Sequence, residues 1–156
     1  MALQIGDSAP DFSLPAGPGP DRVSLSDYRD EKPVVLLFYP FAYSSTCTDE
    51  LCAIGDDWSV WEELDAQVLG LSVDSPFVVA KFREELGLDF PLLSDFNKEA
   101  ATAYDAIYDD FYGSHGVAKR AAFVVDRAGV IRYTWVTEDA GVVPDFAEIR
   151  GVLANL

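Results

Sequence analysis

The pattern of hydrophobic and polar residues along the chain predicts buried strands alternating with amphipathic helices. Residues 33–39, PVVLLFY, are β-branched, aliphatic and aromatic without alternation, which is typical of a central strand buried on both faces. Residues 47–64 then carry large hydrophobic side chains at helical spacing, which predicts a helix with one apolar face. That face comprises Leu51, Ile54, Trp58, Trp61 and Leu64.

The rest of the chain continues these two patterns. Further strands are predicted at residues 67–73, 121–125 and 130–136, with a turn at 126–129, and further helices at 76–86, 98–104 and 146–154. Pro76 suits a first helical turn, and Gly87 suits a helix end. Near the N-terminus, DFSL and VSL flank the Pro/Gly loop at residues 15–21 and predict a β-hairpin. Ser26 is predicted to cap a short helical turn that follows.

The order of these elements predicts the fold class. A strand, a helix, a strand and a helix are followed by a strand hairpin and a last helix, which indicates an α/β protein with a central mixed sheet and helices on both faces. The 156 residues fit one domain spanning residues 1–156. A buried strand that leads into a helix opening with cysteine is the thioredoxin-like arrangement, here with an N-terminal hairpin added.

The charge balance narrows the range of partners. Asp and Glu number 27 against 11 Lys and Arg, for a net charge of −16, so nucleic acid and anionic membrane surfaces are not expected to bind. No apolar run reaches the roughly 20 residues of a membrane span, and the N-terminus lacks a secretory signal pattern, so we expect a cytoplasmic protein. The acidity fits a well-solvated surface or adaptation to high salt, which a melting series in KCl would distinguish.

Two cysteines, Cys47 and Cys52, carry the candidate chemistry. Thiols in the cytoplasm are normally reduced, and two cysteines with the single His115, in a glycine-flanked loop, do not make a four-ligand metal site. Cys47 is predicted to lie where a helix begins, and the partial positive charge there stabilises a thiolate, the nucleophilic form of cysteine. A buried, inert cysteine is the alternative.

The residues around Cys47 resemble the peroxiredoxins, thiol peroxidases with a thioredoxin-like fold. Pro40, Ser44 and Cys47 fill the signature P-x-x-x-[ST]-x-x-C, and Arg120 in KRAAFVVDRAG takes the place of an arginine just before a strand. GDSAPDFSL, VLGLSVDS and FPLLSD extend the resemblance over most of the chain, although the tail after Glu138 carries no motif.

The resemblance implies a role for each of these residues. Cys47 is the peroxidatic cysteine, whose thiolate attacks hydrogen peroxide or an organic hydroperoxide and becomes a sulfenic acid, without a cofactor or metal. Arg120, the Ser44 hydroxyl and the Cys47 N–H would stabilise the charge on the leaving oxygen. Pro40 would shield the thiolate from water. Taken singly, Pro40 could merely end the strand, Ser44 could be a helix cap, and Arg120 could belong to a surface ion pair.

Cys52 and Glu50 resemble features of the Q-type, or bacterioferritin-comigratory, branch of the family. There the second cysteine resolves the sulfenic acid as an intramolecular disulfide, and Glu50 would orient Arg120; as a first-turn acid it could also simply stabilise the helix. Five residues of helix rise about 7.5 Å and turn the two side chains about 140° apart. A disulfide needs Cα atoms roughly 4.4–6.8 Å apart, so the helix must unwind for this bond to form.

Other functions remain open from the sequence. The chain also resembles the one-cysteine, alkyl hydroperoxide reductase E-like branch, which an external thiol regenerates. A protein thiol–disulfide oxidoreductase is disfavoured by the absence of C-x-x-C, and the third alternative is a non-enzymatic binding domain. The family resemblance implies thioredoxin or a similar thiol as reductant, a monomer or homodimer, and an apolar pocket to which Phe41, Tyr43 and tryptophan side chains would contribute.

Overall fold

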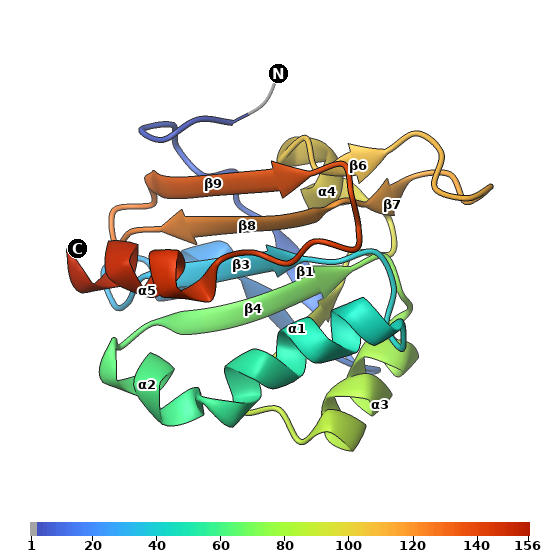
Figure 1. Cartoon of the computed structure of the whole chain (residues 1–156), viewed down its shortest axis with the longest axis horizontal. Coiled ribbons are helices and arrows are strands. Elements are labelled where there is room, and N and C mark those ends of the chain that lie inside the picture. The colour runs from blue at the N-terminus through green and yellow to red at the C-terminus, as the bar shows by residue number, and fades with distance from the viewer. Residues whose placement is uncertain (1–2) are drawn as a thin grey trace.

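A five-stranded mixed sheet organises the computed structural model, which describes residues 3–156 (Figure 1). Its strand order is β5-β4-β3-β8-β9; β3, β4 and β5 run parallel, and β8 and β9 are each antiparallel to the strand before them in this order. The strands are β3 (Val34–Phe38), β4 (Gln67–Ser72), β5 (Leu92–Ser94), β8 (Arg120–Val125) and β9 (Ile131–Thr137). The predicted mixed sheet is confirmed.

Strand β3 is buried on both faces, as its sequence predicts. All five of its residues are at most 2% exposed. Val34 and Leu36 point into one hydrophobic layer, and Val35 and Leu37 point into the other. Because successive strand side chains project to opposite faces, a continuous apolar run is what a strand between two cores requires.

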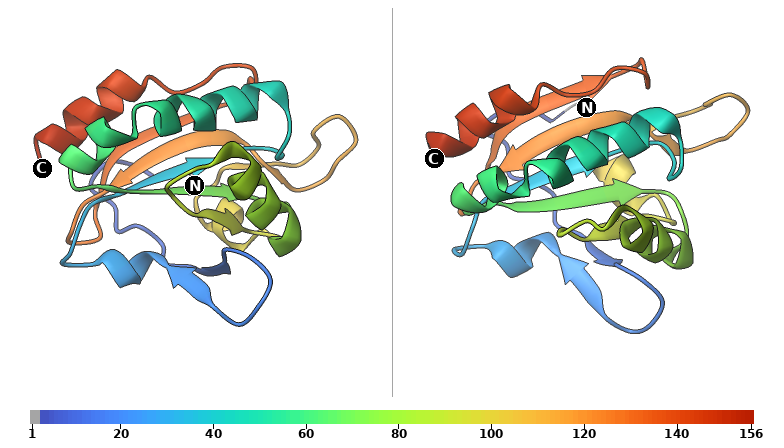
Figure 2. Two further views of the ribbon diagram at one scale, coloured as in Figure 1. Left: turned by 90° about the horizontal axis from the view of Figure 1, so that it is seen from below. Right: turned by 60° about the horizontal axis from the view of Figure 1, so that its bottom comes forward.

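Helices cover both faces of the sheet (Figure 2). Side chains of α1 (Ser45–Asp56), α2 (Trp58–Glu63), α3 (Pro76–Leu86) and α5 (Phe146–Ala154) pack in the layer that contains Val35. The opposite layer is closed by the short helix η1 (Leu25–Tyr28), by α4 (Glu99–Ala103) and by the predicted N-terminal hairpin of β1 (Ser13–Pro15) and β2 (Arg22–Ser24). One helical layer therefore carries both cysteines.

Two helix predictions need correction. The single helix expected at residues 47–64 is two helices, because Asp57 leaves helical geometry with ψ +26° and α2 starts again at Trp58. The short helix η1 is capped by Ser24, not by Ser26, which lies inside it. The Ser24 N–H donates to the Asp27 carboxylate at 2.9 Å, which is half of a capping box and fixes the start two residues earlier.

Three short strands are not predicted from the sequence. Strand β5 has three residues, and β6 (Ile107–Tyr108) and β7 (Val117–Ala118) have two each, so none is long enough to show an alternating pattern. Strands β6 and β7 pair with each other at the base of a hairpin that projects beside the end of the sheet (Figure 1). This hairpin matters because it reaches the site described below.

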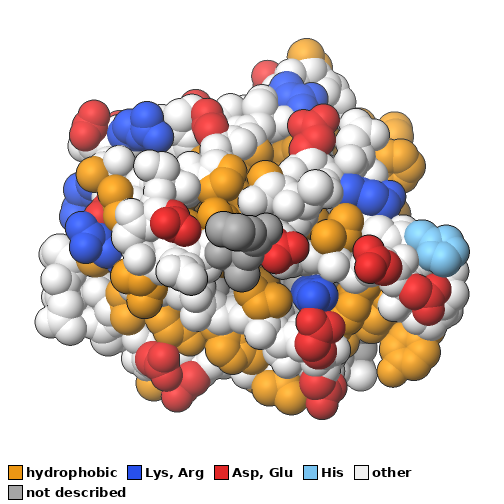
Figure 3. Space-filling view, turned by 90° about the horizontal axis from the view of Figure 1, so that it is seen from above, with side chains coloured by type: hydrophobic (Ala, Val, Ile, Leu, Met, Phe, Trp, Pro, Cys, Tyr) orange, Lys and Arg blue, Asp and Glu red, His pale blue; other side chains and the backbone are white. Residues whose placement is uncertain are grey.

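Acidic side chains are scattered over the face shown in Figure 3, among hydrophobic and uncharged groups, rather than gathered into one patch. Within residues 3–156, no helix is long and apolar enough to cross a membrane.

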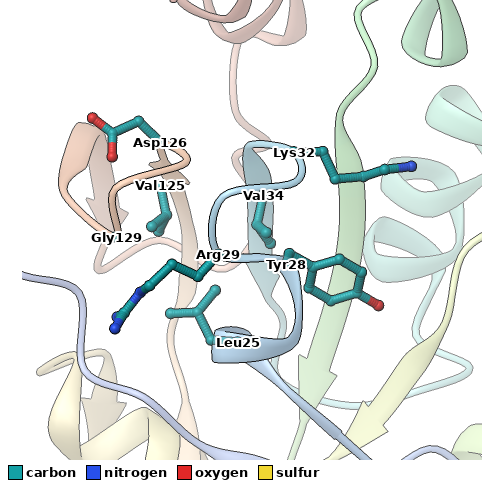
Figure 4. Close-up of a pocket in the computed structure, with 8 residues that line it drawn as sticks. All are labelled: Leu25, Tyr28, Arg29, Lys32, Val34, Val125, Asp126 and Gly129. Carbon is teal, nitrogen blue, oxygen red and sulfur yellow. The ribbon is translucent and has the colours of Figure 1, made fainter.

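Between η1 and the β8–β9 turn lies a cavity of about 10 Å³, which has room for about one water (Figure 4). Its lining residues are Leu25, Tyr28, Arg29, Lys32, Val34, Val125, Asp126 and Gly129.

Candidate active site

Cys47 lies in the first turn of α1, directly after the loop that leaves β3. The helix begins at Ser45, two residues earlier than predicted, with Ser44 as its N-cap. The Cys47 N–H donates to the Ser44 hydroxyl oxygen at 3.3 Å, and the Thr48 N–H donates to the Ser44 carbonyl at 2.9 Å. Ser44 is therefore a helix cap, and its hydroxyl keeps its own hydrogen for a second partner.

Arg120 reaches Cys47 because β8 runs antiparallel to β3. Phe38, the last residue of β3, pairs with Ala121, so the first residue of β8 lies where the chain leaves β3 for α1. Arg120 is that first residue, rather than one just before the strand. Its Nη2 donates to Cys47 Sγ at 3.1 Å, and the side chain is 1% exposed, so the surface-pair alternative is wrong.

Two further contacts fix the Arg120 guanidinium. Glu50 follows Cys47 by one helical turn on the same face of α1, and its Oε2 accepts a bond from Arg120 Nη1. Arg120 Nε donates to the carbonyl of Ala140 at 2.9 Å. Cys47, Glu50 and Arg120 are all at most 1% exposed. The planar guanidinium of Arg120 is therefore buried and held by three contacts, one of which places its positive charge against the Cys47 sulfur.

The charges in this cluster are strongly perturbed. Burial raises the pKa of Glu50 to about 7 although Arg120 acts in the opposite direction, and Glu50 Oε1 has no hydrogen-bond partner among residues 3–156. Burial by itself lowers the pKa of Arg120, but Glu50 and Cys47 outweigh it and raise that pKa, so the guanidinium stays a cation. A permanent cation therefore lies against the Cys47 sulfur.

A pocket of about 200 Å³ opens beside this cluster. Phe41 and Phe111, with ring centroids 6.3 Å apart, form an aromatic wall at its mouth. Phe41 lines the pocket as expected, but neither Tyr43 nor a tryptophan does, so that part of the expectation is wrong; Trp61, for example, is buried in the core. The lining residues are Pro40, Phe41, Ser44, Thr46, Phe111, Arg120, Ala140 and Gly141.

Sequence reasoning missed the contribution of Phe111 and Ala140. Phe111 comes from the hairpin between β6 and β7, and Ala140 comes from the tail after β9, which carries no motif. Neither has a signal of its own, because an alanine offers only its backbone carbonyl and a single aromatic in a hairpin loop is common. Only the fold brings both segments to the end of the sheet that holds Cys47.

Cys52 lies on the same helix and is not bonded to Cys47. Both cysteines are free, and α1 runs unbroken from Ser45 to Asp56, so they are separated by about 7.5 Å along the axis. Cys52 is half-buried; burial raises the pKa of its thiol, and the nearby Asp56 and Asp49 add to that effect. His115 lies in the projecting hairpin, and no three ligand-type side chains within residues 3–156 are placed to share a metal ion.

Comparison with known proteins identifies the class to which this fold and site belong. The AhpC/TSA family matches residues 5–134, and the chain therefore belongs to it. Alkyl hydroperoxide reductase E of Mycobacterium bovis is 37% identical over 131 residues, covering 84% of each sequence. A chloroplastic 2-cysteine peroxiredoxin of Chattonella marina var. antiqua is also 37% identical, covering 87% of this chain and 72% of that protein.

Solved structures agree with the sequence relatives. The crystal structure of peroxidoxin BcpB from Mycobacterium tuberculosis superposes with a TM-score of 0.82 at 32% identity, covering 97% of this chain and 95% of that one. The AhpC structure from the same organism gives 0.83 at 28% identity, covering 99% and 93%. The predicted thioredoxin-like peroxiredoxin fold is confirmed. The protein is a thiol-dependent peroxidase, an enzyme that uses a peroxide substrate and a thiol reductant.

Proposed function

We propose that Cys47 is the peroxidatic cysteine and that the pocket beside it receives the peroxide. The observation that carries this assignment is the 3.1 Å contact of Arg120 Nη2 with Cys47 Sγ. The thiolate is the nucleophilic form of cysteine, and a cation at this distance lies against the sulfur that would carry its negative charge. The thiolate attacks one peroxide oxygen, a sulfur–oxygen bond forms as the O–O bond breaks, and the leaving oxygen takes a proton to give water or an alcohol. Sulfur thereby loses two electrons to the peroxide.

The neighbouring groups have distinct tasks in this step. Arg120 and the free hydroxyl hydrogen of Ser44 stabilise the negative charge that passes to the leaving oxygen. Pro40 lines the pocket without an N–H and keeps water from the sulfur. Glu50 orients Arg120 through their buried ion pair. The apolar wall of Phe41 and Phe111 suits the alkyl group of an organic hydroperoxide as well as hydrogen peroxide.

Cys52 is the proposed resolving cysteine. Its thiol attacks the sulfenic acid of Cys47, water leaves, and an intramolecular disulfide results. Since the intact helix keeps the two residues too far apart, α1 unwinds over its first turns in each cycle. A dithiol reductant, for which we propose thioredoxin, then reduces the disulfide by exchange. We place the enzyme in the cytoplasm, as a monomer or homodimer.

The test is consumption of hydrogen peroxide and of tert-butyl hydroperoxide by the native protein and by Cys47→Ser, with reduced thioredoxin present. The substitution should abolish both activities while leaving the fold intact by circular dichroism. Undiminished activity in Cys47→Ser would contradict the assignment. An insulin-reduction assay separates the peroxidase from a protein thiol–disulfide oxidoreductase, which would reduce insulin without peroxide.

A further inference from the structure

One carboxylate from outside the loop between β3 and α1, residues 40–44, bonds to the backbone of that loop. The backbone N–H of Ala42 donates to Asp74 Oδ2 at 2.7 Å. Among residues 3–156, no other side chain from outside the loop hydrogen-bonds to the backbone of residues 40–44. Asp74 follows the end of β4, so this bond links the segment that positions Ser44 and Cys47 to the neighbouring parallel strand.

Asp74 is itself firmly held. The hydroxyl of Ser72 donates to the same Oδ2 at 2.7 Å, and the hydroxyl of Ser94 donates to the Asp74 carbonyl at 2.6 Å. Ser72 ends β4 and Ser94 ends β5, and both are at most 2% exposed. Asp74 is thus held by two buried strand ends, its carboxylate by Ser72 and its backbone carbonyl by Ser94. Bonds to a charged acceptor are the stronger kind.

The loop that Asp74 holds contains a strained residue. Tyr43 has φ +71°, a left-handed conformation that residues with a large side chain rarely adopt. It immediately precedes Ser44, the N-cap of α1. The Tyr43 ring packs against Phe82 of α3 with centroids 4.8 Å apart, although the side chain is half-exposed. A strained residue persists only where its surroundings hold it, and here they are Asp74 and Phe82.

We propose that Asp74 is a positioning residue that acts as a latch on this loop. While the hydrogen bond between Ala42 and Asp74 is intact, Ser44 caps α1 and Cys47 stays in contact with Arg120, in the position from which it reacts with peroxide. When the bond opens, the strain at Tyr43 relaxes and the first turns of α1 unwind, which brings Cys47 within reach of Cys52. The second statement rests on the resolving role proposed for Cys52. The latch therefore favours the peroxide step and opposes the resolving step.

These opposite effects supply the test. In Asp74→Ala, the second-order rate constant for oxidation of Cys47 by hydrogen peroxide should fall about tenfold, as expected for loss of one charge-assisted bond. The rate constant for conversion of sulfenic acid to disulfide should rise by about the same factor. Asp74→Asn keeps an oxygen that accepts from Ala42 and should stay within about threefold of the native enzyme in both. Quenched-flow mass spectrometry with dimedone trapping follows both steps.

The controls separate a latch from simple destabilisation. Asp145 accepts backbone N–H bonds at the start of α5, so Asp145→Ala loses comparable bonds and should alter neither rate by more than about twofold. Should Asp74→Ala fail to fold, Ser72→Ala removes one support of the carboxylate and should shift both rates less, in the same two directions. The proposal is wrong if the two rates fall together, if neither changes, or if Asp74→Asn behaves like Asp74→Ala.

The first rate is also measured in a Cys52→Ser background, where no resolving step occurs. A native protein that forms no intramolecular disulfide would defeat the role of Cys52, while the effect of Asp74→Ala on the peroxide step would still decide the positioning role of Asp74. A normal disulfide with unchanged rates in Asp74→Ala would defeat the latch and leave the proposed function standing.

Discussion

The two cysteines lie on one helix in opposite surroundings. Cys47, in the first turn of α1, is fully buried and receives a hydrogen bond from the guanidinium of Arg120. Cys52, in the second half of the same helix, is half-buried, and burial together with Asp56 and Asp49 raises the pKa of its thiol. One sulfur faces a cation at a pocket, and the other lies among carboxylates.

The different surroundings of Cys47 and Cys52 suit two identical side chains to different chemical roles. A thiolate attacks peroxide, so the proposed nucleophile needs the cation, whereas Cys52 is better kept as a protonated, unreactive thiol until a sulfenic acid is available. Five residues of helix keep the two sulfurs apart meanwhile.

Removing the second thiol should stop catalytic cycling but not the oxidation of Cys47. Cys52→Ser should oxidise at Cys47 as fast as the native protein, because Cys52 contacts neither the pocket nor Arg120. Cycling with thioredoxin should be lost, since no disulfide forms. Coupled oxidation of reduced thioredoxin measures cycling, and a single-turnover assay measures the first step. Full cycling in Cys52→Ser would assign the enzyme to the one-cysteine type instead.

Replacing Arg120 by lysine should slow the oxidation of Cys47 by peroxide. Arg120→Lys keeps the positive charge but cannot reproduce the planar fork that contacts Cys47, Glu50 and Ala140 together. The second-order rate constant with hydrogen peroxide should drop about 10²- to 10³-fold, as for loss of an oxyanion donor. Arg127→Lys, at a half-exposed surface pair, is the matched control. A rate within threefold of native would show that charge alone suffices.

Glu50 should make stability depend on pH. Because burial raises its pKa from 4.5 to about 7, folded Glu50 holds a proton that the unfolded chain releases between these values. Its contribution is full below about pH 4.5 and is lost as the pH rises through about 7. The stability of the native protein relative to Glu50→Gln should therefore fall by on the order of 3 kcal/mol over this range. Urea melts measure it.

A matched substitution guards against a general effect of removing one carboxylate. Glu62 is exposed on α2, and Glu62→Gln should leave the pH dependence of the urea melts as in the native protein. A difference between native and Glu50→Gln that does not change with pH would show that folding does not raise the pKa of Glu50.

The acidic surroundings of Cys52 should give the smallest effect. Asp56 raises the pKa of the Cys52 thiol, so Asp56→Asn should lower that pKa and speed alkylation by iodoacetamide at pH 8 about twofold. The Cys47→Ser background leaves Cys52 as the one thiol to react. Glu63→Gln on α2 provides a control. An unchanged or slower reaction would show that Asp56 does not act on this sulfur.

The sequence was a good guide where a pattern is long or a motif is local. The continuous apolar run predicts β3, and the signature around Cys47 predicts Pro40 and Ser44 at the pocket, where both lie. Only the family resemblance predicts the role of Arg120, since its contact with Cys47 spans 73 residues and depends on the register of β3 with β8.

Features that depend on tertiary structure alone could not be predicted. The carbonyl of Ala140 and the ring of Phe111 reach the site only because two connecting segments meet at one end of the sheet. The break at Asp57 cannot be predicted from the sequence, because the apolar spacing continues into α2. Asp74 lies within a recognisable block, VLGLSVDS, yet nothing in that block says that its carboxylate accepts from Ala42.

The central claim is that α1 unwinds so that Cys52 can reach Cys47. Hydrogen exchange measured by mass spectrometry tests it on the native protein before and after one equivalent of hydrogen peroxide. We predict a loss of two hydrogens in the peptide that carries both cysteines, with amides of residues 44–53 exchanging far faster than in the reduced protein. A sulfenic acid that persists on Cys47, with those amides still protected, would contradict the account.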